Sequence, residues 1–203
     1  MKTIIFLVSS FLFIVTSYQI ERNDTWDTLI LLIAPIVGIS VLKLCNIKII
    51  EAQNVEVKWF KIACLLGVVY AFLKLFIKLT VFNHQLATYS VGLDKLIENI
   101  FMIIVFMPIL EEFFFRGILF DDLKKIFGTT FTISITSVAF VALHIKNFSD
   151  DEVFGSVIAM LPGIIFYNYL KVKTNNFLLS YVAHVTHNII VFSFVTTIFR
   201  NIE

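Results

Sequence analysis

The chain is poor in charge. Of its 203 residues only 15% are Asp, Glu, Lys or Arg, whereas 59% are hydrophobic and 23 are phenylalanine. The mean hydropathy is +0.91. A soluble domain of this size cannot bury so much apolar surface, so lipid must solvate most of the chain. The net charge of +1 gives no indication of nucleic-acid binding. We therefore expect an all-α, multi-spanning helical membrane protein with no nucleic-acid partner.

Cysteines, repeats and processing signals are equally scarce. Cys45 and Cys64 lie in or beside apolar runs without CxxC spacing, so we expect packing residues and neither a disulfide nor a metal site. The chain has no internal repeat, no low-complexity stretch and no polar segment large enough to fold separately. No small-x-small cleavage site follows the first apolar segment cleanly, which favours a retained membrane span over a signal peptide.

Long apolar runs dominate what remains, and a membrane-spanning helix needs about 20 such residues. Polar connectors, such as residues 121–125, separate the runs. The distribution of lysine favours a cytoplasmic N-terminus, although Lys74 and Lys78 at the outer end of the third run count against it. The sequence predicts a cell-membrane bundle of seven helices, at roughly 4–19, 27–47, 60–82, 98–120, 130–146, 153–171 and 177–199.

Charged residues interrupt the fourth run, where Glu111, Glu112 and Arg116 fall within six residues. A charge at the bilayer centre costs roughly 2.5–3.5 kcal/mol on insertion scales, so three together indicate a functional polar site that faces the bundle interior. Glu112 and Arg116 have the i,i+4 spacing of a helical ion pair. Glu111 points in a different direction and, without a local partner, is a candidate general base. Pro108 is expected to kink the helix just upstream.

Two later runs bring further polar side chains to membrane depth. His144 ends the fifth run, one helical turn after Phe140, and the last run contains His184, His187 and Asn188. His184 and Asn188 have i,i+4 spacing, with His187 on the flank of the same face. A single histidine in an apolar helix is more often structural than catalytic. Because an unpaired polar group in lipid costs several kcal/mol, however, we expect the polar groups of the three helices to converge.

The depths of these residues give one conflict. Glu111 lies roughly 14 Å from the inner boundary, too deep to snorkel, and His184 and Asn188 have similar depths. His144 comes out deeper. It agrees with the others only if the stretch around Gly128 runs along the membrane interface before the fifth helix enters.

Together these pieces resemble the CAAX protease and bacteriocin-processing (CPBP) family of intramembrane proteases, often called the Abi family. That family is marked by Glu-Glu-x-x-x-Arg, Phe-x-x-x-His and His-x-x-x-Asn on separate membrane helices. The resemblance covers roughly residues 98–192, so we expect a catalytic helical core at 91–203 and N-terminal helices of variable, substrate-related role at 1–90. The three motifs occur in that order at residues 111–116, 140–144 and 184–188.

The resemblance also implies roles. Glu111 with His144 would activate a water for attack on a peptide carbonyl. His184 and Asn188 would stabilise the oxyanion, and a histidine can donate in either protonation state if the right nitrogen carries the proton. Structural or orienting roles are left for three residues, Glu112, Arg116 and Phe140.

A zinc mechanism is the alternative for the same cluster, because family members are often labelled metalloproteases. Glu111, His144 and His184 would then supply an open three-ligand site. The chain has no HExxH pair, and a carboxamide is a poor zinc ligand. We therefore expect glutamate-activated water and no metal cofactor.

The sequence thus predicts an intramembrane endopeptidase acting on a membrane-associated peptide or protein, such as a prenylated tail, a signal-type peptide, a pheromone or a bacteriocin. The abundance of Lys, Ile, Asn and Phe suits an AT-rich bacterial genome, where peptide processing or self-immunity is the usual family role by analogy. Two alternatives use the same polar cluster: a partner-binding bacteriocin-immunity protein and a proton-relay transporter. The lack of an inverted repeat argues against the transporter.

Overall fold

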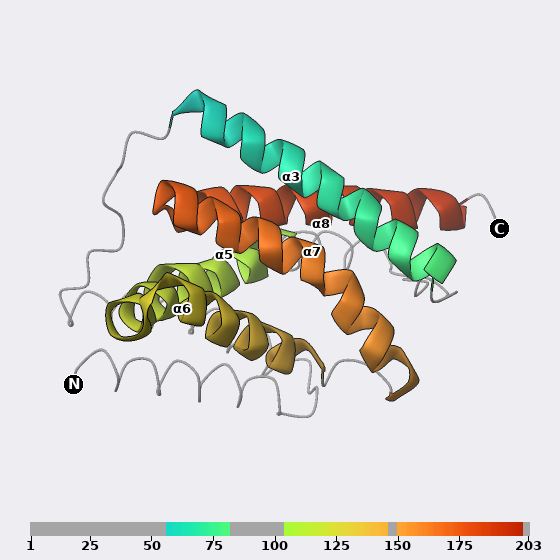
Figure 1. Cartoon of the computed structure of the whole chain (residues 1–203). Coiled ribbons are helices and arrows are strands. Elements are labelled where there is room, and N and C mark those ends of the chain that lie inside the picture. The colour runs from blue at the N-terminus through green and yellow to red at the C-terminus, as the bar shows by residue number, and fades with distance from the viewer. Residues whose placement is uncertain (1–55, 82–103, 146–149, 201–203) are drawn as a thin grey trace, which may run out of the picture. The chain divides into compact units, whose positions relative to one another are not determined.

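The computed structural model describes residues 56–81, 104–145 and 150–200 (Figure 1). The predicted helices at 4–19 and 27–47 lie outside these residues. Within the described ranges the chain is helical apart from short connections, and it contains no strand. The prediction of an all-α membrane bundle is confirmed.

Within each described range the helical elements follow one another directly or across the short connection between α7 and α8. Helix α5 carries Pro108 in its first turn and continues a helical stretch that begins at Ile104, so the expected kink at this proline stays a prediction. The segments η1 and η3 have π-helical backbone, as do residues 104–106, and such wider turns often occur at functional sites. The elements are α3 (Val57–Phe76), η1 (Ile77–Val81), α5 (Met107–Glu112), η3 (Phe113–Leu119), α6 (Phe120–Ile145), α7 (Asp150–Thr174) and α8 (Phe177–Arg200).

Four helical stretches in the described ranges are long and apolar enough to span a membrane: Val57–Thr80, Ile104–His144, Val153–Thr174 and Phe177–Phe194. They correspond to the last five predicted runs, because the fourth and fifth runs join in one helical stretch. The expected polar connector at 121–125 is therefore wrong: these residues form the start of α6. Local pairing explains the helix, since Lys125 Nζ lies 3.0 Å from Asp122 Oδ1, three residues earlier.

Gly128 divides this long stretch. At 41 residues, a straight helix would be roughly 62 Å long, about twice the hydrocarbon core of a bilayer. Gly128 has φ 73° and ψ 175°, a conformation open to glycine and strained for other residues. The chain therefore changes direction between the first two turns of α6 and the part that carries His144. The kink lies within the stretch that the sequence analysis expected to run along the membrane interface; that interfacial placement stays a prediction.

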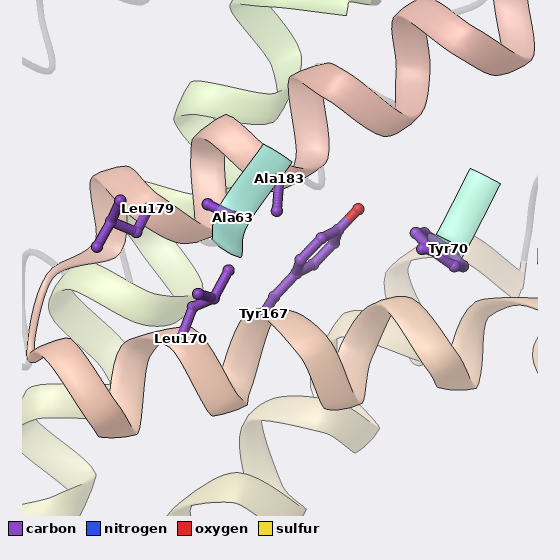
Figure 2. Close-up of a cluster of buried hydrophobic side chains, with 6 residues drawn as sticks. All are labelled: Ala63, Tyr70, Tyr167, Leu170, Leu179 and Ala183. Carbon is purple, nitrogen blue, oxygen red and sulfur yellow. The ribbon is translucent and has the colours of Figure 1, made fainter. Parts of the chain in front are cut away.

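The best-packed part of the bundle lies where α3, α7 and α8 meet (Figure 1). Helix α3 packs along α8 and α7, while α6 packs on η3 and α7. Figure 2 shows the buried cluster between them, with Tyr167 projecting from α7 toward Ala183 of α8. The cluster consists of Ala63, Tyr70, Tyr167, Leu170, Leu179 and Ala183.

Two glycines allow the helices to approach this closely. A Cβ added at Gly67 of α3 would lie 2.5 Å from the Ala183 carbonyl oxygen, and one at Gly163 of α7 would overlap the ring of Tyr70. Small residues at such contacts are the usual means of helix packing in membranes, where lipid removes the hydrophobic drive for association. The predicted domain boundary at residue 90 falls outside the described residues. Helix α3, which that prediction placed in the N-terminal part, packs directly on α7 and α8.

Candidate active site

Glu112 and Arg116 form a fully buried ion pair. Both side chains are 0% exposed, and Arg116 Nη1 donates to Glu112 Oε1 at 3.2 Å. Aromatic faces surround the guanidinium: its Cζ lies 4.7 Å from the ring centroid of Phe140, 5.5 Å from that of Tyr167 and 5.9 Å from that of Phe115. Cation–π attraction of this kind offsets part of the desolvation cost of an arginine. The ion pairing predicted from the i,i+4 spacing is confirmed.

Glu111 lies between two imidazoles. Its Oε1 is 3.8 Å from His144 Nε2 and its Oε2 is 3.9 Å from His184 Nε2. Both distances are too long for direct hydrogen bonds, but a water molecule can join polar groups at such a separation. The side chains of Glu111 and His144 are 19% and 25% exposed, so this part of the cluster is open. The fold therefore brings together three of the four predicted catalytic residues, from α5, α6 and α8.

Phe140 orients His144 in two ways. The His144 Nδ1–H donates to the Phe140 carbonyl oxygen at 2.8 Å, because a carbonyl can only accept. The two rings also stack, with centroids 4.4 Å apart and an angle of 29°. With Nδ1 carrying the hydrogen, a neutral His144 presents Nε2 as an acceptor toward Glu111. The Phe-x-x-x-His spacing thus fixes both the tautomer and the direction of the ring.

His184 has a partner that the sequence analysis did not predict. Its Nδ1–H donates to Glu112 Oε1 at 3.0 Å, so this oxygen accepts from both His184 and Arg116. A neutral His184 with its hydrogen on Nδ1 can only accept at Nε2. Donation from Nε2 as well requires the imidazolium. Of the two protonation states that the sequence analysis allowed for an oxyanion donor, only the imidazolium therefore fits this hydrogen bond.

The remaining polar residues of α8 lie farther along the helix. Asn188 is half-buried one turn beyond His184, and its expected place in the cluster remains a prediction. His187 is 2% exposed and stacks on Tyr70 of α3, with centroids 4.1 Å apart and an angle of 25°. Its ring centroid lies 6.2 Å from that of His184. His187 therefore joins the cluster to α3.

Sequence reasoning missed two tyrosines that complete this packing. The ring of Tyr167 stacks on His184 at 4.9 Å and meets Tyr70 edge-on at 5.9 Å. Its hydroxyl is buried and has no hydrogen-bond partner among the described residues. A tyrosine in an apolar helix is a common packing residue, so no pattern distinguishes this one. The only available signal was the phenol, a polar group that needs a reason to be inside a membrane protein.

No metal site is evident in the part of the chain that the structure describes. There, no group of three or more His, Cys, Asp or Glu side chains has an arrangement that could hold a metal ion. The zinc alternative considered from the sequence, with Glu111, His144 and His184 as ligands, stays a prediction. Cys64, on α3, carries a free thiol.

Comparison with known proteins identifies the type of core. Residues 94–190 match the family model described as type II CAAX prenyl endopeptidase Rce1-like. This range is just under half of the chain and contains all three motifs, but it excludes α3. No curated protein and no solved structure matches the chain. The resemblance to the CAAX protease family is thus confirmed over this range.

Proposed function

We propose that this multi-pass membrane protein, which matches the CAAX endopeptidase family over residues 94–190, hydrolyses a peptide bond of a membrane-associated peptide or protein. The observation that carries the proposal is the position of the Glu111 carboxylate, within 3.9 Å of two imidazoles inside an apolar bundle. Titratable groups at such depth are costly, and their convergence from three helices supports a chemical role.

In the proposed reaction Glu111 acts as the general base. A water held between Glu111 and His144 gives one proton to the carboxylate, while its second hydrogen bonds to His144 Nε2. The oxygen then attacks the carbonyl carbon of the scissile bond, and the carbonyl electron pair moves to oxygen to form the tetrahedral oxyanion. When the carbon–nitrogen bond breaks, Glu111 passes its proton to the leaving amine. General acid–base catalysis of this type contributes about 10²–10⁴-fold to rate.

We assign the stabilisation of the oxyanion to two residues of α8. His184 in its imidazolium form donates through Nε2 and Asn188 donates through its carboxamide, two preorganised donors of the kind that stabilise developing negative charge. The hydrogen bond of 3.0 Å to Glu112 supports this role, because it supplies an anion beside the imidazolium. Arg116 holds that anion in place at 3.2 Å. Glu112 is thus a positioning residue.

Purified full-length protein in lipid nanodiscs tests the proposal. The substrates are a prenylated CAAX peptide, suggested by the family match, and a set of unprenylated signal-type and bacteriocin-type peptides. We expect the wild type to release a peptide fragment and both Glu111→Gln and His144→Ala to abolish release. Asp122→Asn, which alters a carboxylate paired with Lys125 outside the cluster, is the matched control.

If Glu111→Gln and His144→Ala both retain full cleavage activity, the assignment fails. If the wild type cleaves nothing while the same variants keep full biological activity, the partner-binding alternative gains. The family match disfavours both non-proteolytic alternatives, since it describes an endopeptidase.

A further inference from the structure

The two imidazoles beside the open carboxylate are held in the same way, although they lie on different helices. Each donates its Nδ1–H to a fixed oxygen. For His144 the acceptor is the Phe140 carbonyl oxygen, at 2.8 Å. For His184 it is Glu112 Oε1, at 3.0 Å. Each imidazole also stacks on an aromatic ring, with centroids 4.4 Å apart for Phe140 and 4.9 Å apart for Tyr167. Tyr167 belongs to α7, a helix that carries none of the three motifs.

Both contacts are needed to fix an imidazole. A hydrogen bond at Nδ1 holds one edge of the ring, but the ring can still turn about the line that joins the two bonded atoms. A stacked neighbour removes this freedom, and the planes of Tyr167 and His184 meet at only 19°. Together the two contacts keep His184 Nε2 at 3.9 Å from Glu111 Oε2. Such placement matters because a shift of about 1 Å in an active site can cost about 10²-fold in rate.

The ring of Tyr167 is itself held firmly. Tyr167 is 2% exposed, and the ring of Tyr70 on α3 meets it edge-on at 5.9 Å. The Cζ of Arg116 lies 5.5 Å from its centroid. Figure 2 shows the side chain directed from α7 at α8, beside Ala183, the residue that precedes His184. A ring with neighbours from three other elements is a rigid support for an imidazole.

The ring of Tyr167, and not its hydroxyl, makes these contacts. The hydroxyl is buried and has no hydrogen-bond partner among the described residues. The ring face, in contrast, suits the form of His184 that the proposed reaction needs, because an aromatic face attracts a cation within about 6 Å of its centroid. A phenylalanine at this position would keep the ring contacts and lose only the unpaired polar group.

We propose that Tyr167 is a positioning residue of this active site, whose ring holds the imidazole of His184 with Nε2 directed toward Glu111. It does for His184 what Phe140 does for His144. The inference rests on the proposed peptidase function and adds to it a residue from α7.

Nuclear magnetic resonance tests the contact without any substrate. The probe is the full-length protein in lipid nanodiscs, isotope-labelled only at its four histidines. A stacked aromatic ring moves imidazole proton signals upfield, and the His184 signals are identified by their loss in His184→Asn. We expect Tyr167→Leu to move them downfield and to leave the His144 signals in place, while Tyr167→Phe keeps the wild-type spectrum. Unchanged His184 signals in folded Tyr167→Leu protein would reject the proposal.

Cleavage kinetics test the consequence. Tyr167→Leu should lower kcat by about two- to tenfold, the effect that corresponds to one aromatic contact, and leave KM unchanged. Tyr167→Met is the second variant in case the leucine protein does not fold. Tyr167→Phe should retain most of the wild-type kcat. An equal loss in Tyr167→Phe and Tyr167→Leu would overturn the proposal, because the hydroxyl would then carry the role.

Phe166→Leu is the matched control. It removes the neighbouring ring of α7, which packs against the same buried cluster. We expect a lower melting temperature with the wild-type kcat. If this variant loses as much kcat as Tyr167→Leu at the same melting temperature, Tyr167 is only a packing residue and the proposal fails.

The two measurements separate this inference from the proposed reaction. The spectra should change as described even if the wild type cleaves none of the peptides, in which case the proposed function fails and the orientation of His184 by Tyr167 stands. If the wild type cleaves a peptide while Tyr167→Leu keeps both kcat and the His184 signals, this inference fails and the proposed function stands.

Discussion

The two adjacent glutamates lie in contrasting parts of one polar cluster. Around Glu112 the cluster is closed: side chains are 0% exposed and hydrogen bonds of 3.0 and 3.2 Å hold the carboxylate. Around Glu111 it is open: the carboxylate is 19% exposed and stands 3.8 and 3.9 Å from its neighbours. Closed contacts fix geometry, whereas open ones leave room for water and substrate. The contrast favours a structural role for Glu112 and a catalytic role for Glu111.

The largest expected effect tests the open side. Glu111→Gln should lower turnover by about 10²–10⁴-fold while thermal stability in nanodiscs stays near the wild-type value, because a partly exposed carboxylate is replaced by its isostere. Peptide release and the melting temperature are measured on the same preparation. An inactive Glu112→Gln protein that folds as well as the wild type would show that the two roles are exchanged.

Variants of Glu112, on the closed side of the cluster, should change the stability of the folded protein. Glu112→Gln leaves Arg116 buried without a counter-charge, and removal of one partner of a buried ion pair costs about 3–5 kcal/mol. We expect a low folded yield and a lower melting temperature. The double variant Glu112→Gln/Arg116→Met should lose less than the two single variants together, because it removes the unpaired charge. Strict additivity would mean that the ion pair contributes nothing to folding.

A smaller effect is expected where α3 meets α7. Gly163→Ala puts a Cβ against the ring of Tyr70, and overpacking of this kind costs about 1–3 kcal/mol. Gly128→Ala is an informative comparison, since nothing lies near the added Cβ and only the backbone conformation is strained. Both variants should lower the melting temperature in nanodiscs, Gly163→Ala through displacement of the Tyr70 ring and Gly128→Ala through the backbone alone.

The smallest effect is expected from metal removal. If Glu111 activates water directly, dialysis against a chelator should leave cleavage activity unchanged, and active protein should contain less than stoichiometric zinc. Elemental analysis before and after dialysis checks both points. Stoichiometric zinc that is lost together with activity, and restores activity when added back, would assign Glu111, His144 and His184 as ligands instead.

Several features of the site could be predicted because they are local. The ion pair of Glu112 and Arg116 follows from helical periodicity, which places i and i+4 on one face whatever surrounds them. The contact of His144 with Phe140 has the same origin, four residues apart on one helix. The depth of His144 singled out the stretch around Gly128, which the sequence analysis expected to run along the membrane interface, and the structure has a kink at this glycine.

Other features were out of reach because they depend on how helices rotate and pack. The hydrogen bond between His184 and Glu112 joins residues 72 positions apart, and no spacing rule reaches that far. The stacking of Tyr167 on His184 depends on the approach of α7 to α8. The helical start of α6 was mistaken for a connector, because its Asp and Lys residues read as a polar loop until their pairing with one another and with Lys171 of α7 is seen.

By itself, the sequence determined that lipid is the solvent, that the chain crosses it as helices, and that a few costly polar groups must find one another inside. These conclusions need only the composition, the helical period and the free-energy cost of placing a charged group in hydrocarbon. Only the tertiary structure decided which group meets which: that Glu112 is enclosed while Glu111 stays open, that the Nδ1 of His184 binds Glu112, and that α3 brings Tyr70 against His187. Such choices depend on helix rotation and on close approach at small residues, which no single helix encodes.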